Sequence, residues 1–379
     1  MKTLRLIGVV DPAFGSPSVS SINSAIAAQR AGIDTTVAFP VDPARPEIAD
    51  AAIARLTGEA VAVETFAPAR RWGISLALRR WLGAHRRDYD IIHCHGAWAM
   101  PSYLALRYAG RRRAPKIVLS PHEGLTEFDI ARTPNRWRAR LKRRRRERYL
   151  RRLDLIVVTS RLEAFDSMPL EMTRGPRVAV IPHPVYDERR HEARARIAMV
   201  TTDGLRVGFL GRLEPGKNLD LVLRSLPRVS PNVSLAVAGD GGEGPRLRRM
   251  AAEIGVADRV RWLGLVSGAA REEFFRHIDL LVMPSDYECF GMAAGEALAA
   301  GVPALVTHET GIGEIIEAGG GGEIITRDPA DIAAVIEKLL HNPHRLAQYS
   351  RQAAAAAEAT LSYSAHGARI RQHYEKLLR

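Results

Sequence analysis

Two glutamates stand where a short apolar run gives way to a helical pattern. Glu288 follows the run Leu280–Met283, and Glu296 falls in the early turns of the helix that Gly291 opens. Two carboxylates can do acid–base chemistry, but a loop position and a helix position argue against a pair that shares one proton. Gly291 lets the backbone approach a ligand, and the N–H groups of a helix start suit sugar hydroxyls or phosphate. These residues predict a ligand-binding loop, against the alternative of a surface loop and an ordinary helical glutamate.

Two cations follow a second apolar run, Arg206–Leu210. Gly211 makes a turn there, and Arg212 and Lys217 lead into a further helical pattern. Arginine can bind a diphosphate with two parallel hydrogen bonds, and lysine can bind it as a point charge. This segment therefore predicts a diphosphate site. Gly239 follows another apolar run, where a ligand turn and a simple turn remain alternatives.

Strand-like and helical segments alternate along the whole chain, which predicts an α/β protein with parallel sheets covered by helices on both faces. The expected strands of the first half are Leu4–Val10, Asp34–Phe39, Ile91–His93, Lys116–Ser120, Leu155–Thr159 and Val178–Ile181. Those of the second half are Arg206–Leu210, Val233–Ala238, Val260–Leu263, Leu280–Met283, Ala304–Val306 and Gly322–Ile325. Two such runs imply two Rossmann-like domains, at residues 1–185 and 186–359, with a final helix at about 360–379 that packs back on the first domain.

The segment 284–303 resembles the E-x7-E signature of the retaining GT-B glycosyltransferases of family GT4. The matching residues are Pro284-Ser285, Glu288, Phe290-Gly291, Glu296-Ala297 and Gly301-Val302-Pro303. The segment from Gly211 to Lys217 is similar to the family's G-R-x-x-x-x-K-G element, with Asn218 where the family often has glycine. The resemblance implies the GT-B fold, in which two Rossmann-like domains face each other across a cleft. It also implies transfer of a sugar from a nucleoside-diphosphate sugar to an acceptor hydroxyl, with retention of configuration.

The resemblance also implies roles for single residues. Glu288 lies by the transferred sugar, and Glu296 holds the ribose hydroxyls of the nucleotide. The expected donor-binding residues are Gly211, Arg212, Lys217, Gly239, Glu288, Phe290, Gly291, Met292 and Glu296. The expected catalytic residues are His122, Arg212, Lys217 and Glu288. The UDP- or GDP-sugar donor is a co-substrate, and no cofactor or metal ion is expected, because the cations and helix N–H groups can neutralise the leaving diphosphate.

Histidines follow two strands of the first half. His122 resembles the family's strand-end histidine, whose place is against the donor sugar, and His93 and His95 are similar to its strand ending in H-x-H. We expect His93 and His95 to point to opposite sides if their strand continues, which weakens a metal site. The expected acceptor-side residues are Gly15, Ser16 and His95, although the family commonly has paired glycines where this chain has only Gly15.

Most of the net charge of +13 is concentrated in one segment. Twelve basic residues stand between Arg132 and Arg152, against the single acidic residue Glu147. We expect the helix Arg136–Arg152 to bind an anionic membrane surface, with an apolar edge made by Trp137, Leu141, Tyr149 and Leu150. Nucleic-acid binding and a solvated helix face are the alternatives. Of these, we do not expect nucleic acid to be the partner.

The remaining sequence features bound the protein class. No apolar run reaches the roughly 18 residues of a membrane span. The first residues predict a buried strand rather than a signal peptide, and the distant Cys94 and Cys289 indicate no disulfide framework. We therefore expect a cytoplasmic enzyme, peripheral on the inner face of the plasma membrane, that glycosylates a glycan or lipid-linked acceptor in glycolipid, lipopolysaccharide or exopolysaccharide synthesis. A glycoside hydrolase that uses the two glutamates, and a basic nucleic-acid-binding or scaffold protein without catalysis, are the alternatives.

Overall fold

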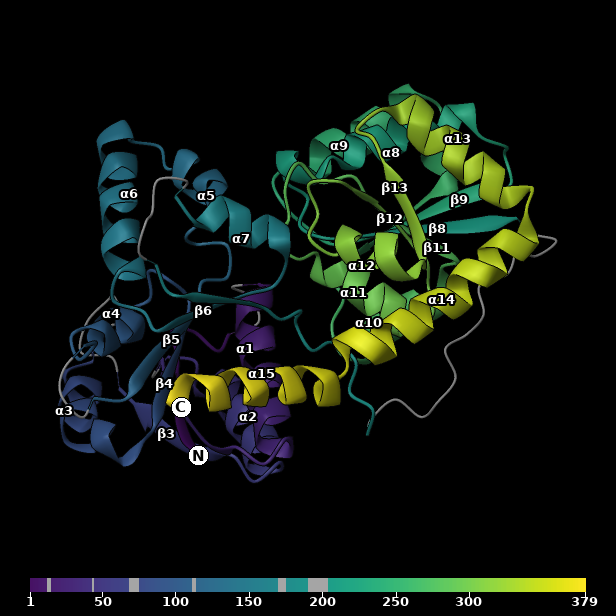
Figure 1. Cartoon of the computed structure of the whole chain (residues 1–379). Coiled ribbons are helices and arrows are strands. Elements are labelled where there is room, and N and C mark those ends of the chain that lie inside the picture. Colours follow the sequence, from purple (N-terminus) through teal and green to yellow (C-terminus); the bar gives the residue numbers. More distant parts are fainter. Residues whose placement is uncertain (12–14, 43, 68–74, 111–113, 170–174, 190–203) are drawn as a thin grey trace. The chain divides into compact units, whose positions relative to one another are not determined.

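The structure is a computed structural model that describes residues 1–379 except 12–14, 43, 68–74, 111–113, 170–174 and 190–203, and except the side chain of Ser16. The described residues form two compact units (Figure 1). Met1–Pro184 and Tyr363–Arg379 make the first unit, and Val185–Ser362 make the second.

The first unit is built on a seven-stranded sheet whose strands are all parallel. Its strands are β1 (Lys2–Ile7), β2 (Asp34–Pro40), β3 (Ala62–Phe66), β4 (Ile91–His95), β5 (Lys116–Ser120), β6 (Leu155–Val158) and β7 (Arg177–Val180). The strand order is β3-β2-β1-β4-β5-β6-β7. Successive strands are thus added on one side of β1 up to β3 and on its other side from β4 onward, so the strand order reverses between β1 and β4. Ligands of open parallel sheets bind at such a reversal, beyond the carboxyl ends of the strands.

Helices cover both faces of this sheet. They are α1 (Ser16–Arg30), α2 (Pro46–Thr57), α3 (Leu76–His85), α4 (Met100–Leu106), α5 (Glu127–Ala131), α6 (Arg136–Leu150), α7 (Arg161–Ser167) and α15 (Tyr363–Leu378). The apolar residues of α1, α2 and α15 pack on one face, and those of α3, α4 and α6 pack on the other. Both faces are therefore buried, which explains why the strands are nearly continuous apolar runs.

The second unit repeats this plan with a six-stranded parallel sheet. Its strands are β8 (Leu205–Leu210), β9 (Val233–Ala238), β10 (Val260–Gly264), β11 (Leu280–Met283), β12 (Ala304–Thr307) and β13 (Gly322–Ile325). The order is β10-β9-β8-β11-β12-β13, and the reversal falls between β8 and β11. The prediction of two Rossmann-like parallel-sheet domains is confirmed.

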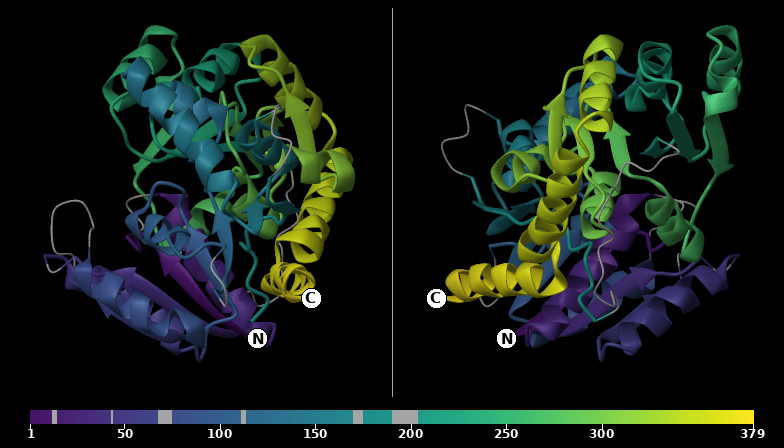
Figure 2. Two further views of the ribbon diagram at one scale, coloured as in Figure 1. Left: turned by 60° about the vertical axis from the view of Figure 1, so that its left-hand side comes forward. Right: turned by 90° about the vertical axis from the view of Figure 1, so that its right-hand side faces the viewer.

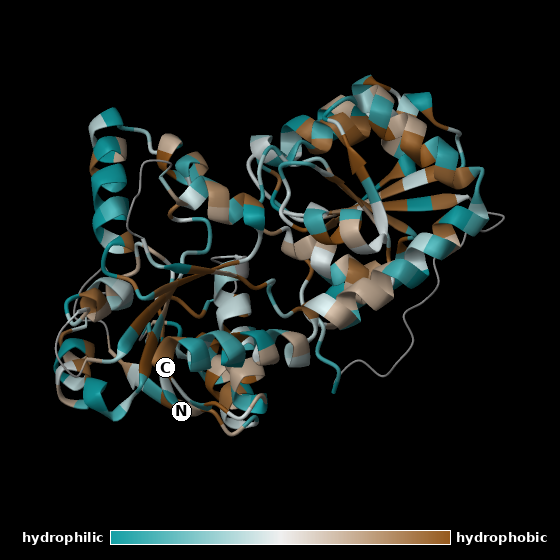
Figure 3. Cartoon of the chain, in the orientation of Figure 1, coloured by the Kyte–Doolittle hydropathy of each residue, from teal (hydrophilic) through white to brown (hydrophobic). Residues whose placement is uncertain are grey.

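The helices of the second unit also lie on two faces. They are α8 (Leu219–Ser225), α9 (Gly244–Glu253), α10 (Ala269–His277), α11 (Met292–Ala299), α12 (Gly313–Gly319), α13 (Pro329–Leu340) and α14 (Pro343–Leu361). The core under α8, α9 and α13 is separate from the core under α10, α11 and α12, and α14 contributes to both, with Leu346 and Tyr349 in the first and its later residues in the second. Figure 3 shows the strands of both units mainly in the hydrophobic colours and α6 mainly in the hydrophilic ones.

One strand of the first sheet was not predicted from the sequence. β3 stands at the edge, and three of its five residues are exposed. An edge strand needs no continuous apolar run, because only part of its surface is buried. Within the described ranges, no helix is long and apolar enough to cross a membrane.

The helix α15 completes the core of the first unit, although the whole second unit precedes it in the chain. It packs along α1 (Figures 1 and 2) and buries Ile370 and Tyr374 against the sheet. The two helices approach closely at Gly367, where a Cβ atom would stand only 2.4 Å from the carbonyl oxygen of Ala27. Only glycine fits this contact.

We therefore expect Gly367→Ala to lower the free energy of unfolding by about 1–3 kcal/mol, because the added methyl forces the two helices apart. Gly83→Ala is the matched control. Gly83 also lies in a helix, α3, but a Cβ atom there meets only the Tyr108 hydroxyl, at an ordinary 3.6 Å. Urea denaturation measures both variants, and equal effects would contradict the close approach of α15 to α1.

Candidate functional site

The loops that follow β8 and β11 are tied together at the reversal of the second sheet. The Asn218 side-chain amide donates to the carbonyl oxygen of Pro284 at 2.9 Å and to Asp286 Oδ1 at 2.8 Å. In return, the backbone N–H of Asp286 donates to the carbonyl oxygen of Gly216 at 2.9 Å. The segments predicted to carry the cations and the glutamates therefore form one connected surface.

Asn218 itself explains why this chain can differ from the family's glycine. Its backbone is left-handed, with φ 54° and ψ 37°, at the start of α8. Glycine and asparagine adopt this conformation most readily among the residue types. Asparagine keeps the turn and adds the side-chain bonds that hold the neighbouring loop.

Lys217 and Glu288 are in direct contact. The Lys217 ammonium forms an ion pair with Glu288 Oε1, which also accepts a hydrogen bond from the Ser285 hydroxyl at 3.1 Å. Glu288 is fixed from its backbone as well, because its N–H donates to the carbonyl oxygen of Glu309 at 2.8 Å. The pair brings a cation and a carboxylate together at the carboxyl ends of β8 and β11.

Gly291 begins α11 beside this pair in the chain. Its φ is 94°, and a Cβ atom would lie 2.8 Å from Met283 Cε and 2.8 Å from Thr310 Cγ2. Both the conformation and the lack of space require glycine. The preceding Phe290 is 1% exposed, packs in the core and accepts from the Ile312 N–H at 2.7 Å, so its side chain is closed to a ligand, whereas Met292 is partly buried.

Glu296 lies in the second turn of α11 and is paired with a residue that the sequence did not single out. Arg271 Nε donates to Glu296 Oε2 at 2.5 Å. Burial raises the pKa of the Glu296 carboxyl, and the Arg271 charge opposes that rise. Nothing in the sequence around Arg271 marks it, because it is one of several charged residues on α10.

Arg212 differs from Lys217 in its surroundings. Its side chain is 69% exposed and pairs with Glu214 at 3.0 Å. An exposed ion pair contributes little stability, so the guanidinium can turn to another anion at small cost. Close backbone packing supports this loop, since a Cβ atom on Gly239 would stand 1.8 Å from the carbonyl oxygen of Gly211.

In the first unit, four histidines form a row of stacked rings. The ring centroids of His93 and His95 are 4.4 Å apart, those of His95 and His122 are 5.4 Å apart, and those of His122 and His183 are 5.4 Å apart. Burial lowers the pKa of His122 to about 4 and holds the pKa of each of the other three well below the ordinary value. The row is therefore neutral at neutral pH.

The expectation that His93 and His95 point to opposite sides was wrong. β4 continues through both residues, and residues two apart in a strand share one face of the sheet. His183 was not predicted, although it stands two residues after the expected strand Val178–Ile181, within a Pro-His-Pro sequence. No group of residues able to hold a metal ion is found in the part of the chain that the structure describes.

The loop that carries His122 is held in an uncommon conformation. His122 and Glu123 both have positive φ, 50° and 70°. The buried Glu163 carboxylate accepts from the Glu123 N–H at 3.0 Å, and from the N–H and the hydroxyl of Thr159 at 2.7 Å each. Burial raises the pKa of Glu163, and these hydrogen bonds oppose that rise. A buried carboxylate thus stabilises a backbone that costs about 1–3 kcal/mol per residue.

Of the expected acceptor-side residues, Gly15 begins α1 with φ 95°. The side chain of Ser16 lies outside what the structure describes, as do residues 12–14 of the same loop. His95 is 4% exposed, so it reaches a ligand only through its neighbours in the row.

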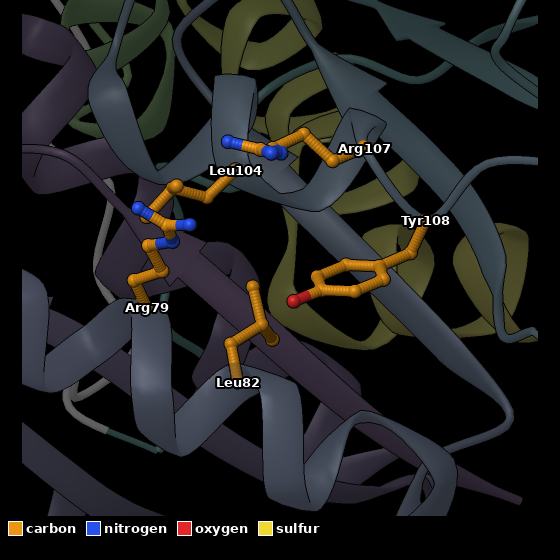
Figure 4. A pocket seen from close by; sticks show the side chains of 5 residues that line it. All are labelled: Arg79, Leu82, Leu104, Arg107 and Tyr108. Atoms are coloured by element: carbon orange, nitrogen blue, oxygen red, sulfur yellow. The ribbon is translucent and has the colours of Figure 1, made fainter.

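A small cavity of about 130 Å³ lies elsewhere in the first unit (Figure 4). It is lined by Arg79, Leu82, Leu104, Arg107 and Tyr108, which come from α3 and from α4 and the residues that follow it. None of the predicted site residues lines it. We therefore place the candidate site at the strand reversals and not in this cavity.

Two Rossmann-like units, the second with charged loops at its strand reversal, form an architecture that is common among nucleotide-binding α/β proteins. Two family models match the chain, one described as Glycosyltransferase Family 4 over residues 19–189 and one described as glycosyl transferases group 1 over residues 195–356. Together they span most of the chain, which belongs to glycosyltransferase family GT4.

Similar proteins agree with this assignment. An uncharacterised glycosyltransferase of Methanocaldococcus jannaschii is 33% identical over 144 residues, which are 37% of this chain and 37% of that protein. A D-inositol 3-phosphate glycosyltransferase of Stackebrandtia nassauensis is 32% identical over 213 residues, which are 52% of this chain and 48% of that protein. The chain thus spans about half or less of the length of these relatives.

The crystal structure of Anabaena HepE in complex with UDP and glucose has the same fold. Its TM-score is 0.73 at 18% identity, and the match covers 99% of this chain and 100% of that one. The fold is therefore GT-B, as the resemblance implied.

The Glu163 contacts lead to a stability prediction. Glu163→Gln replaces one accepting oxygen by an NH₂ group that faces N–H donors, so we expect a loss of about 1–3 kcal/mol in the free energy of unfolding. Asp166→Asn is the matched control on the same helix. Among the described residues, Asp166 Oδ2 accepts only from the Phe128 N–H, at 3.1 Å, and an asparagine can still accept there. If urea denaturation gave the two variants the same small effect, Glu163 would not hold the loop.

Proposed function

We propose that this protein transfers a glycosyl group from a UDP- or GDP-sugar to an acceptor hydroxyl with retention of configuration. The observation that carries the proposal is the Lys217–Glu288 contact at the strand reversal of the second sheet. It brings a cation of the kind that binds phosphate and a carboxylate together, close in the chain to the helix start at Gly291. The family assignment and the UDP in the HepE complex support a nucleotide-sugar donor.

In this proposal, Lys217 and Arg212 bind the diphosphate of the donor. Both cations are already paired with glutamates, Glu288 and Glu214, so a diphosphate exchanges one anionic partner for another rather than meeting bare charges. The released Glu288 carboxylate can then accept from sugar hydroxyls. Helix N–H groups beyond Gly291 add to the stabilisation of the leaving group.

Glu296 is proposed to hold the ribose. One of its oxygens is taken by Arg271, and the other accepts no hydrogen bond from the described residues. An accepting oxygen suits a ribose hydroxyl, which needs an acceptor for its proton. His122 of the first unit is proposed to act beside the transferred sugar.

The reaction breaks the bond between the anomeric carbon and the phosphate oxygen, and forms a bond from that carbon to the acceptor oxygen. The proton of the acceptor hydroxyl goes to the leaving nucleoside diphosphate. No divalent metal is proposed, because Arg212 and Lys217 neutralise the diphosphate. A glycoside hydrolase would need two carboxyls that flank one bond, whereas Glu288 and Glu296 are each paired with a cation that suits a donor site.

The helix α6 supports an acceptor at an anionic membrane surface. Its inner side is paired and buried, because Lys142 binds Asp129 at 3.2 Å and Arg146 binds Glu127 at 3.3 Å. Tyr149 and Leu150, expected at an apolar outer edge, pack in the core instead. That part of the sequence prediction was wrong, because the two residues fall on the side of α6 that faces the sheet.

The outward side of α6 combines apolar and basic residues. Trp137 is 59% exposed and Leu141 is 37% exposed. Arg144 and Arg148 follow at positions +7 and +11 from Trp137, which places all four on one face. The other exposed arginines of α6 are Arg136, Arg138, Arg140 and Arg145. We propose that this face binds anionic lipid at the cytoplasmic side of a membrane, in the synthesis of glycolipid, lipopolysaccharide or exopolysaccharide.

The donor site makes a binding prediction. Lys217→Met and Glu296→Ala should each weaken UDP or GDP binding about tenfold or more, because each removes one charge-assisted contact. Glu288→Ala should chiefly lower the turnover number. Arg249→Gln, which removes an exposed charge on α9, is the control and should bind as the wild type does. Calorimetric titration measures affinity, and unchanged affinity in both Lys217→Met and Glu296→Ala would overturn this donor site.

The outward face of α6 makes a second prediction. Arg144→Gln/Arg148→Gln should reduce binding to phosphatidylglycerol-containing vesicles roughly tenfold or more, at about 1 kcal/mol per charge. Trp137→Ala/Leu141→Ala should also reduce it, while Arg79→Gln/Arg107→Gln, an equal loss of charge elsewhere on the first unit, should not. Co-sedimentation at low salt measures the effect. Equal binding to neutral vesicles, or tighter binding to duplex DNA than to any vesicle, would count against a membrane partner.

A further inference from the structure

Arg5 is a buried cation without a carboxylate among the described residues. It lies on β1 and is 0% exposed. Its NH1 group donates to the Ser24 hydroxyl at 2.8 Å and contacts His95 Nε2 at 3.4 Å, and its NH2 group donates to the Tyr374 hydroxyl at 3.5 Å. Burying a charge without a counter-ion is costly, so a group of this kind calls for a role beyond packing.

The contact between Arg5 and His95 settles which ring nitrogen of His95 carries its proton. A guanidinium has donors only, so His95 Nε2 must be the acceptor. Burial and the nearby Arg5 charge both hold the pKa of His95 well below its ordinary value, and the ring is therefore neutral. A neutral imidazole has one proton, which must then be on Nδ1.

This assignment passes to the next ring of the row. His95 Nδ1 lies 3.1 Å from His122 Nε2. Since His95 Nδ1 carries the proton, it donates, and His122 Nε2 accepts. The Ser21 hydroxyl, 3.3 Å from the same nitrogen, gives its own proton to the carbonyl oxygen of Pro17 at 2.6 Å. His122 is neutral too, so its single proton is on Nδ1.

We infer that Arg5, acting through His95, fixes His122 in the form that carries its proton on Nδ1, so that His122 meets a ligand as a hydrogen-bond donor. Arg5 and His95 are thus positioning residues. His122 Nδ1 has no hydrogen-bond partner among the described residues, and stacking between His95 and His183 fixes the ring plane. A donor at this position suits an accepting oxygen, and that it belongs to a sugar or a phosphate rests on the proposed function.

Long-range ¹H–¹⁵N NMR of the histidine rings tests the inference, because protonated and unprotonated ring nitrogens have well separated ¹⁵N shifts. In the wild-type protein without ligand, His95 and His122 should both show a protonated Nδ1 and an unprotonated Nε2 at neutral pH. A protonated Nε2 on His122 would overturn the inference without any variant. This readout does not depend on glycosyl transfer, so a protein that transferred no sugar could still confirm it.

Variants test the part played by Arg5. Arg5→Met removes the donor, and the protonated Nδ1 of His122 should give way wholly or partly to a protonated Nε2. Arg5→Lys keeps a donor and should restore the wild-type form. Ser24→Ala is the matched control, since it removes another partner of Arg5 and leaves the His95 contact intact. Wild-type His122 shifts in folded Arg5→Met would contradict the inference.

Kinetics separate positioning from a merely structural role. Arg5→Met should lower kcat about tenfold, the effect of one lost hydrogen bond, with KM for the donor little changed, because the proposed nucleotide contacts lie in the second unit. A rise in the KM for the donor with unchanged kcat would oppose the inference. If Arg5→Met fails to fold, His95→Phe removes the same donor to His122 and should give the same shift of its proton.

Discussion

In a parallel sheet whose strand order runs outward in both directions from the centre, the loops that follow the two central strands turn to opposite faces of the sheet and leave a crevice between them. The candidate chemistry of this protein depends on that constraint. In the second unit, the loops after β8 and β11 leave their sheet beside each other and carry Lys217 and Glu288. In the first unit, β1 and β4 stand at the reversal and carry Arg5 and His95. The same topology, used twice, thus brings together residues that are far apart in the chain.

The two units treat charge in opposite ways. In the second unit, each candidate charge has a partner of opposite sign, as Glu296 has in Arg271. An anion that binds there replaces the glutamate partner of a cation. No charge of the site is therefore left unpaired when the site is empty. In the first unit, Arg5 has no such partner among the described residues, and burial, to which its positive charge adds, holds the pKa values of His93 and His95 well below the ordinary value and keeps both rings neutral. One site is therefore built from compensated ions, and the other from neutral groups oriented by a single ion.

The sequence predicted the parallel sheets and the residues at their loops, because strand-end positions follow from apolar runs and glycine turns. It did not predict which charges meet. Arg271 comes from α10 and Glu163 from α7, so both lie within helices and not in the loops between strand and helix. It also misjudged Tyr149 and Leu150, because an all-basic helix hides which of its sides faces the core. Which side chains meet across two elements depends on how those elements pack, and the residue pattern within one helix or strand does not show that packing.

The position of α15 has a consequence for how the protein folds during its synthesis on the ribosome. Residues Tyr363–Arg379 belong to the first unit, yet they are synthesised after every residue of the second. The nascent first unit must therefore wait with the sites of Ile370 and Tyr374 open to solvent, at translation rates of about 5–20 residues per second. The second unit is contiguous in the chain and faces no such delay. The Tyr374 hydroxyl also accepts a hydrogen bond from Arg5 and shares one with His93 Nδ1, so the buried cation receives its full set of partners only when translation reaches this helix.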